Sequence, residues 1–334
     1  AGWRADPMLG LIARRLLSAV PLIAGVLTLT FLLVEAAPGR PADLLLGDGP
    51  VTPELRARVE AAYGLDQPGY ARYASWIGNA LCGDLGWSIS RGRQVTSVLA
   101  DALPYTIGLA AAALSIQLLL GVLLGALHVV RPGSPLDHGL GLAGLVLASV
   151  PTFWLGLMAI LLFAVAVPIF PPSSAHSIGA EAWSLPSRAI DALWHGVLPA
   201  LVLGLGAAAI VARFVRTGLV AALGEGFVRA ARARGASGAR VLWVHALPAA
   251  AGPVITLAGL QLPVLVSGAV VVEVVFGWPG MGRVTYDAVM AADLPVILAA
   301  VLLATILVIA GNLLADLGLA FADPRLRLGR KASR

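Results

Sequence analysis

The sequence has little charge of either sign and almost no lysine. Charged residues make up 12% of the 334 positions, whereas a soluble domain of this size carries about 25%. Much of the folded surface must therefore face something other than water. The only lysine is Lys331, so the chain cannot form a phosphate-binding loop in which a lysine contacts the β- and γ-phosphates. ATP hydrolysis by that route is excluded.

Cysteine and histidine are also scarce. Cys82 is single, which excludes an internal disulfide and a thiolate metal cluster. No Gly-x-Ser-x-Gly motif marks a nucleophilic serine. The histidines lie on different segments without the i, i+4 pairing of a helical zinc site; they are His128, His138, His176, His195 and His245. We expect no catalytic, metal or cofactor site in this chain, and no enzyme.

Hydrophobic residues, 59% of the total, gather in six windows that carry almost no charge. A charged side chain at the bilayer centre costs roughly 2.5–3.5 kcal/mol, so such windows predict membrane-spanning helices. Each window has the roughly 17–20 residues that cross about 30 Å of hydrocarbon. The sequence therefore predicts an all-α polytopic membrane protein with six transmembrane helices. The predicted spans are residues 16–34, an uncleaved signal anchor, and residues 103–130, 138–167, 192–212, 241–272 and 294–315.

The basic residues predict the orientation of these spans. If both termini are cytoplasmic, 15 of the 23 cations lie inside, and six of the eight outside fall in one long loop, residues 36–102. Only Arg188 and Arg283 then lie in short outer loops, as the positive-inside rule requires. The net charge of +5 fits this topology better than nucleic-acid binding. We expect a multi-pass protein of the bacterial inner membrane.

Four regions follow from these spans. Residues 1–35 form the N-terminal segment and first helix, and residues 36–102 form a small extracytoplasmic helical subdomain. Residues 103–322 form a five-helix core that contains a cytoplasmic loop, residues 213–245, and residues 323–334 form a cytoplasmic tail. In the subdomain, Thr52, Pro53 and Gly64 are typical of a helix start and end. A second helix there is predicted to have one apolar face, formed by Tyr70, Tyr73, Ala74, Ile77 and Leu81.

Prolines and polar residues inside the spans have two interpretations. Pro151, Pro199, Pro253 and Pro263 either kink ordinary packed helices or break them where they line a passage, above all in the fifth span. Gln261 and Ser267 in that span either face the translocation pathway or pack against neighbouring helices. Glu273 and Asp316 lie at span edges, which disfavours a proton-coupled carrier.

The loop between the fourth and fifth spans is the most informative segment. Six arginines against Glu225 give it a charge of +5, and its centre predicts a short helix that ends at Gly235. A helix too short to be stable alone in water needs a partner surface. The pattern itself leaves two alternatives open, a helix on anionic headgroups and a helix docked on a protein, and makes a DNA-reading helix improbable.

The loop resembles the permease-subunit signature of bacterial ABC importers, in the variant of the dipeptide/oligopeptide/nickel permease family. The resemblance rests on residues 227–237 (FVRAARARGAS) and 245–248 (HALP), with Arg229 where the general signature has Glu and Pro248 where the family usually has Arg. Further similar motifs cover nearly the whole chain; they are residues 11–16 (LIARRL), 83–86 (GDLG) with Ser88, 148–156 (ASVPTFWLG), 268–283 and 323–325 (DPR).

The resemblance implies a second homologous permease subunit, two cytoplasmic ATPase subunits that bind ATP and Mg²⁺, and an extracytoplasmic solute-binding protein. It also implies that the loop helix couples this chain to an ATPase, while the outer subdomain helps to receive the binding protein. The implied coupling residues are Glu225, Phe227, Val228, Arg229, Ala230, Ala231, Arg232, Arg234, Gly235 and Ser237.

The cargo is less well defined. The family carries di- and oligopeptides, nickel and other small solutes, and the spans hold no His, Cys or acidic cluster that would favour a metal ion. We therefore predict import of di- or oligopeptides, with nickel or another solute as the alternative. A stand-alone secondary transporter or channel is the alternative of a different class, and a membrane scaffold a more distant one. Whether the second permease is identical or different is open.

Overall fold

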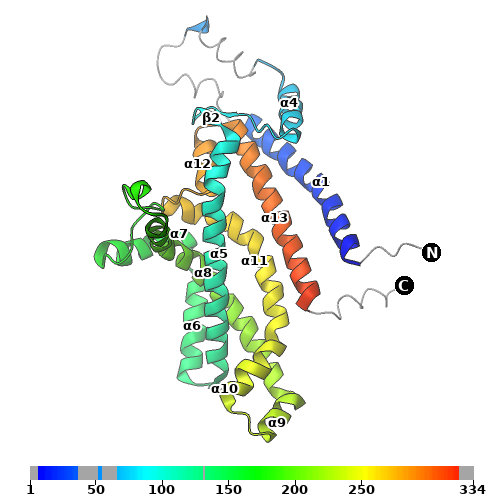
Figure 1. Ribbon diagram of the computed structural model, residues 1–334, viewed down its shortest axis with the longest axis vertical. Coiled ribbons are helices and arrows are strands. Elements are labelled where there is room, and N and C mark those ends of the chain that lie inside the picture. The colour runs from blue at the N-terminus through cyan, green and yellow to red at the C-terminus, as the bar shows by residue number, and fades with distance from the viewer. Residues whose placement is uncertain (1–6, 37–51, 55–65, 131, 323–334) are drawn as a thin grey trace, which may run out of the picture. The chain divides into compact units, whose positions relative to one another are not determined.

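The computed structural model describes residues 7–36, 52–54, 66–130 and 132–322, which divide into two compact units (Figure 1). Unit 1 comprises residues 1–13, 107–278 and 308–334, and unit 2 comprises residues 14–106 and 279–307. The elements are α1 (Pro7–Glu35), α4 (Gly69–Leu81), β1 (Trp87–Ser88), β2 (Arg93–Gln94), α5 (Val95–Val130), α6 (Pro135–Ser149), α7 (Thr152–Ile160), a π-helical turn (Leu161–Ala166), a 3₁₀ turn (Ala180–Ala182), α8 (Leu185–Gly224), α9 (Gly226–Ala233), α10 (Gly238–Arg240), a second π-helical turn (Val241–Ala246), α11 (Leu247–Val275), α12 (Met281–Met290) and α13 (Leu294–Ala322).

Several of these helices match the predicted spans. Within the described residues, five helices are long and apolar enough to cross a membrane, and a bent helix pair adds a sixth if it counts as one span. The five are Ile12–Glu35, Val95–Val130, Leu185–Gly224, Gly238–Gly259 and Leu294–Gly318. The predicted all-α polytopic fold is confirmed.

The third predicted span, residues 138–167, is not one continuous helix. It consists of α6 and of α7 with its π-helical extension, and the two directions differ by 103°. Val150 and Pro151 between them are extended, with ψ angles of 128° and 135°. Proline disfavours a helical conformation at the residue before it. Because Pro151 breaks the helix, α6 by itself is only about 22 Å long, shorter than the hydrocarbon layer.

Other prolines leave their helices continuous. Pro199 lies inside α8, and α11 runs through Pro253 and Pro263 without a break. The fifth span is therefore not a broken helix at its prolines.

The fourth span, predicted as residues 192–212, is part of a helix of 40 residues. At 1.5 Å per residue α8 is about 60 Å long, so its last three turns, predicted as loop, extend the helix beyond the apolar segment.

The buried face of helix α4 differs from the predicted one. Tyr70 and Leu81 are 78% and 85% exposed, whereas the half-buried side contains Tyr73, Trp76 and Ile77. Tyr73 hydrogen-bonds with Thr28 of α1 at 2.8 Å and packs on Phe31. Arg72 donates to Glu35 at 2.7 Å. The face is rotated because aromatic and charged contacts with α1 decide which side packs. Gly64 lies outside the described residues.

In unit 1, α5 and α8 approach each other through small residues. A Cβ atom added to Gly121 would lie 2.5 Å from the Val211 Cβ, and one added to Gly125 would lie 2.6 Å from the Val215 Cβ. No side chain fits in these spaces. Membrane helices associate by such small-residue contacts, because lipid gives no hydrophobic driving force between them.

In unit 2, the start of α5, α12 and the start of α13 share one apolar core. Val95, Val98, Met281, Val296 and Ala299 are all at most 4% exposed in it. The main-chain NH of Met281 donates to the buried Thr106 hydroxyl at 2.8 Å. Helix α12 and the hairpin that precedes α5 are thereby attached to a common base.

Candidate functional site

Helix α9 lies at one end of unit 1, after α8 (Figure 1). It has eight residues, so it needs support from the rest of the chain. That support comes from one side only: Val228 and Ala231 are 0% and 2% exposed and pack with Val241 of the following π-helical turn. Leu223 at the end of α8 packs on the same cluster. The opposite side of α9 is exposed.

The end of α9 is a Schellman motif. Gly235 has φ +83°, the Gly235 NH donates to the Arg232 carbonyl at 2.9 Å, and the Ala236 NH donates to the Ala231 carbonyl at 3.2 Å. Left-handed φ values favour glycine because it has no Cβ. Ala236 also packs on the α9 cluster. The helix stop predicted at Gly235 is therefore present, and the motif directs the chain back toward α10.

The ten residues predicted to couple to an ATPase fall into three groups in the structure. Val228 and Ala231 are buried within the chain. Glu225 and Ser237 precede α9 and α10, and the Ser237 hydroxyl accepts from the Arg240 NH. The other members, exposed as Glu225 and Ser237 also are, are Phe227, Arg229, Ala230, Arg232, Arg234 and Gly235. The residues are close together in space, but the two most buried positions cannot contact a partner.

The buried carboxylate of Asp137 contacts Arg216 in the last turns of α8, and sequence reasoning missed it. Asp137 accepts from the Gly133 NH at 2.9 Å and from Arg216 at 3.3 Å, and its Oδ1 lies 2.5 Å from the His128 Nδ1. His128 and Asp137 are 9% and 8% exposed. The cluster ties the turn between α5 and α6 to α8. Asp137 directly precedes the predicted span of residues 138–167, and the sequence analysis gave it no role.

The predicted pathway residues are less informative. Gln261 is half-buried on α11, and the side chain of Ser267 lies outside the described residues. A more unusual amide belongs to Gln117 of α5, which is 0% exposed and whose Oε1 and Nε2 have no hydrogen-bond partner among the described residues. No group of three or more potential metal ligands occurs in the described part of the chain.

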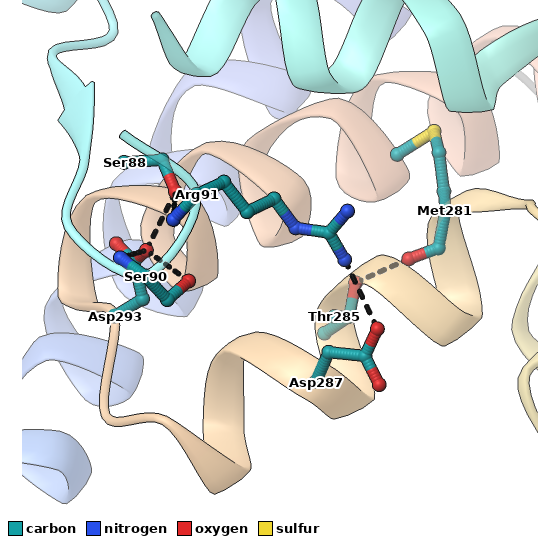
Figure 2. A network of polar contacts seen from close by, with 7 residues as sticks. All are labelled: Ser88, Ser90, Arg91, Met281, Thr285, Asp287 and Asp293. Atoms are coloured by element: carbon teal, nitrogen blue, oxygen red, sulfur yellow. Dashed lines mark hydrogen bonds and ion pairs between the residues drawn. The ribbon is translucent and has the colours of Figure 1, made fainter. Parts of the chain in front are cut away.

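Unit 2 contains a second polar network, which holds the hairpin of β1 and β2 (Figure 2). The strands pair Trp87 with Gln94 and Ser88 with Arg93. Asp293, between α12 and α13, is fully buried and its Oδ2 accepts three hydrogen bonds, from the Ser88 hydroxyl at 2.7 Å, the Ser90 NH at 2.9 Å and the Ser90 hydroxyl at 2.8 Å.

Arg91 extends from the tip of this hairpin toward α12 (Figure 2), where its Nη2 donates to Asp287 at 3.0 Å. The Arg91 NH also donates to the Ser88 hydroxyl at 3.2 Å. The sequence analysis gave Asp293 no role. Its partners are about 200 positions away, and a single aspartate between two helices carries no local signal of that contact.

Comparisons with known proteins agree with this architecture. Residues 117–328 match the family of binding-protein-dependent transport system inner membrane components, and residues 8–110 match the N-terminal region model of the same kind of component. The oligopeptide transport system permease protein AppB of Bacillus subtilis is 35% identical over 320 residues, covering 96% of this chain and 99% of that protein.

Two further proteins are similar. The di/tripeptide transport system permease protein DppB of Pseudomonas aeruginosa is 37% identical over 333 residues, covering 96% of this chain and 99% of its own. A solved structure of the MetNI methionine ABC transporter in an inward-facing conformation has a TM-score of 0.53, with 20% identity, over 68% of this chain and 97% of that one. This last likeness concerns the fold. The chain belongs to the family of binding-protein-dependent transport system inner membrane components, and it is a multi-pass permease subunit of the ABC importer class.

Proposed function

We propose that this chain forms half of the translocation pathway of an ATP-driven importer of di- or oligopeptides. Its partners are a second homologous permease, two cytoplasmic ATPases that bind ATP and Mg²⁺, and an extracytoplasmic solute-binding protein. The family as a whole depends on ATPase and binding-protein partners; the stoichiometry belongs to the proposal. Helix α9 couples the chain to one ATPase, and alternating access follows from its movement.

The one-sided burial of α9 is the observation that carries the coupling role. Phe227 is 44% exposed, and Ala230 and Arg234 are exposed at helical spacing from it. They form an open face with one aromatic side chain, one small side chain and one cation, next to the buried side of Val228 and Ala231. Because α9 already packs against its own chain, a partner that binds its open face and moves can displace α9 and the adjoining helices as a rigid body.

Leu223 connects this seat to the helices of unit 1. It packs on the α9 cluster and also on a larger cluster of α5, α8 and α11 that contains Val215, Leu219 and Ala250. Close-packed side chains transmit displacement because they are not freely compressible. Movement of α9 therefore displaces the ends of α8 and α11 together.

The orientation with both termini in the cytoplasm is supported by the distribution of arginine. With this orientation α9 and the last turns of α8, including Arg213 and Arg216, face the cytoplasm. Residues 36–102 and α12 then lie on the outer side. Residues 103–322 form the permease core, and the tail, residues 323–334, lies outside the described residues.

Peptides are the proposed cargo because the two sequence relatives are named for oligopeptide and di/tripeptide transport. A nickel importer is the alternative cargo. Uptake of labelled di- and tripeptides into proteoliposomes with the complete complex, in competition with Ni²⁺, distinguishes them. We expect unlabelled peptides, but not Ni²⁺, to compete with the labelled peptides. Competition by Ni²⁺ but not by peptides would make nickel the cargo and would leave the importer class unchanged.

The first test is purification of the tagged chain from its own host in mild detergent, followed by mass spectrometry of the proteins that copurify. A second permease, ATPases and a solute-binding protein are expected. A chain that purifies alone and moves solute in an ion gradient without ATP would refute the importer and support a secondary transporter.

A matched pair of substitutions tests the coupling face. Ala230→Leu adds the same side chain as Ala231→Leu, but on the exposed side of α9. We expect Ala230→Leu to leave the permease stable and to reduce ATP-driven uptake by about tenfold or more, because a bulky residue disturbs a close-packed contact with the partner. Ala231→Leu should instead destabilise the chain by about 1–3 kcal/mol through overpacking. Normal uptake by a stable Ala230→Leu complex would rule out this face as the coupling contact.

A further inference from the structure

Helix α6 is attached to the rest of unit 1 less tightly than the helices around it. Of its 15 residues, all of them described, only Asp137 is buried. The apolar cluster that joins α5, α8 and α11 contains Ala126 and Val215 but, among the described residues, no residue of α6. Along its length α6 only touches α8, since a Cβ atom added to Gly144 would lie 3.4 Å from the Ala209 Cβ. The buried anchor of α6 is therefore a carboxylate.

Asp137 joins α6 to both helices beside it. Its carboxylate accepts from Arg216 of α8 at 3.3 Å and lies 2.5 Å from the Nδ1 of His128 at the end of α5. The Gly133 NH, in the turn between α5 and α6, donates to the same carboxylate at 2.9 Å. Because Asp137 is 8% exposed, its attraction to Arg216 is stronger than it would be in water. One side chain thus fixes the start of α6 against α5 and α8.

The turn between α5 and α6 is less restrictive than these bonds. It contains Gly133 at φ +75°, and glycine adopts a wider range of backbone conformations than other residues. The covalent connection therefore fixes where α6 begins, whereas the bonds of Asp137 fix the direction in which it runs.

The other end of α6 has the features of a hinge. Val150 and Pro151 are extended between α6 and α7, and a few residues at the ends of elements can absorb a change of direction. Beyond them α7 is held tightly. Gly156 and Ala159 are buried, and a Cβ atom added to Gly156 would lie 3.2 Å from the Val275 Cγ1 of α11. A groove of about 500 Å³ in the bend, lined by residues of both helices, leaves room for α6 to move.

Arg216 connects α6 to the α9 end of α8. It precedes Leu223 by seven residues, which is about two helical turns, so the two side chains lie on nearly the same side of α8. Leu223 packs on the α9 cluster. A displacement of α9 that moves the end of α8 therefore also moves Arg216.

We propose that Asp137 is the positioning residue through which movement of α9 and α8 reaches α6; this inference rests on the proposed function. When α9 is displaced, Arg216 and His128 carry Asp137 with them. Helix α6 then turns about Val150 and Pro151 while α7 stays packed on the far end of α11. The bend between α6 and α7 therefore changes in each transport cycle, and the carboxylate makes α6 follow the coupling helix without contacting the solute.

The first measurement is the distance between two spin labels on α6 and α7 in the complete importer in nanodiscs. One label replaces Gly139, where added atoms meet open space, and the other replaces the 48% exposed Leu157. The chain carries Cys82→Ser, and the complex has no other accessible cysteine. We expect the distance to shift when ATP and vanadate are added to the nucleotide-free complex. Arg216→Gln and Asp137→Asn should each abolish most of this shift.

Transport provides the second measurement. Arg216→Gln should reduce the amount of solute imported per ATP hydrolysed by about 2- to 30-fold, while the complex still assembles and hydrolyses ATP. The matched control is Arg213→Gln, the same change at an exposed position one turn earlier on α8. It should change neither the distance shift nor this ratio. Arg216→Lys keeps the charge and should retain most of both.

Three results would overturn the proposal. The first is an undiminished distance shift in both Arg216→Gln and Asp137→Asn, which would mean, even with reduced uptake, that Asp137 only stabilises the fold. The second is an equal loss of the shift in Arg213→Gln. The third is a wild-type importer that imports solute without any change in the distance, which would leave the proposed function intact. If the wild-type complex shows no ATP-driven import, the proposed function itself fails, and this inference fails with it.

Discussion

Helix α9 and the hairpin of residues 87–94 are both too short to be stable by themselves, and the protein holds them by different interactions. Helix α9 is held by apolar contacts of Val228 and Ala231 with its own chain. The hairpin is held by three hydrogen bonds to the buried carboxylate of Asp293. Both present arginines on their exposed side.

The difference matters for what each segment can do. Apolar contacts have no preferred direction, so they keep α9 seated while allowing small shifts of the whole helix. Hydrogen bonds to a carboxylate require definite distances and angles, so they fix the hairpin in one position. Apolar contacts therefore suit α9, which is proposed to move during coupling. Hydrogen bonds suit the hairpin, which is held in one position.

The largest effect is expected at the hairpin. Asp293→Ala leaves the Ser88 and Ser90 donors without their acceptor, and we expect a loss of about 3 kcal/mol in stability. Thermal unfolding in nanodiscs measures it, and protease cleavage within residues 87–94 reports whether the hairpin detaches. Asp287→Ala is the control, because the 46% exposed Asp287 makes only a surface pair. Equal destabilisation by both would mean that the Asp293 network does not hold the hairpin.

A smaller effect is expected at the seat of α9. Val228→Ala removes two methyl groups from a position with 0% exposure, and we expect a loss of about 2 kcal/mol. Phe227→Ala, next in the sequence but 44% exposed, should cost less than about 0.5 kcal/mol. Phe227→Ala should instead weaken binding of the isolated ATPase subunits to the permease. A stability loss larger for Phe227→Ala than for Val228→Ala would contradict the assigned faces of α9.

The helix ends provide a finer comparison. Gly235 after α9 has φ +83°, and Gly235→Ala introduces a Cβ into a left-handed conformation. We expect a loss of about 1 kcal/mol in stability. The measurement is the thermal unfolding midpoint, with Gly226→Ala, a position without positive φ, as the control. An unchanged midpoint for Gly235→Ala would show that the Schellman motif contributes little.

The smallest effect has the opposite sign. Helix α12 ends in the same motif, with the Asp293 NH donating to the Ala288 carbonyl at 2.9 Å, but alanine occupies its left-handed position, Ala292 at φ +47°. Ala292→Gly relieves this conformation and should stabilise the chain by about 0.5 kcal/mol. A decrease in the unfolding midpoint would mean that the alanine methyl makes a contact worth more than the strain.

Sequence reasoning succeeded where the signal is local. The apolar windows identified the membrane-spanning segments, and the motif at residues 227–237 identified the short helix and its stop at Gly235. It failed where two distant segments decide the outcome. Helix α4 turned its Tyr73 and Ile77 side toward the rest of the chain and left Tyr70 and Leu81 exposed. At Pro151 the sequence left a kink and a break open, and the structure has a break with a bend of 103°.

The sequence by itself determined the membrane character, the family and the short basic helix, because hydrophobicity, charge and motif spacing act over a few turns of one segment. Only the tertiary structure decided which side of α9 is open, and that Ser88 and Ser90 meet Asp293 across some 200 positions. Burial and hydrogen bonding depend on which segments become neighbours. The groove that the hairpin, the start of α5 and α12 form, with Arg91, Arg93 and Arg283 in its lining, therefore exists only in the folded chain.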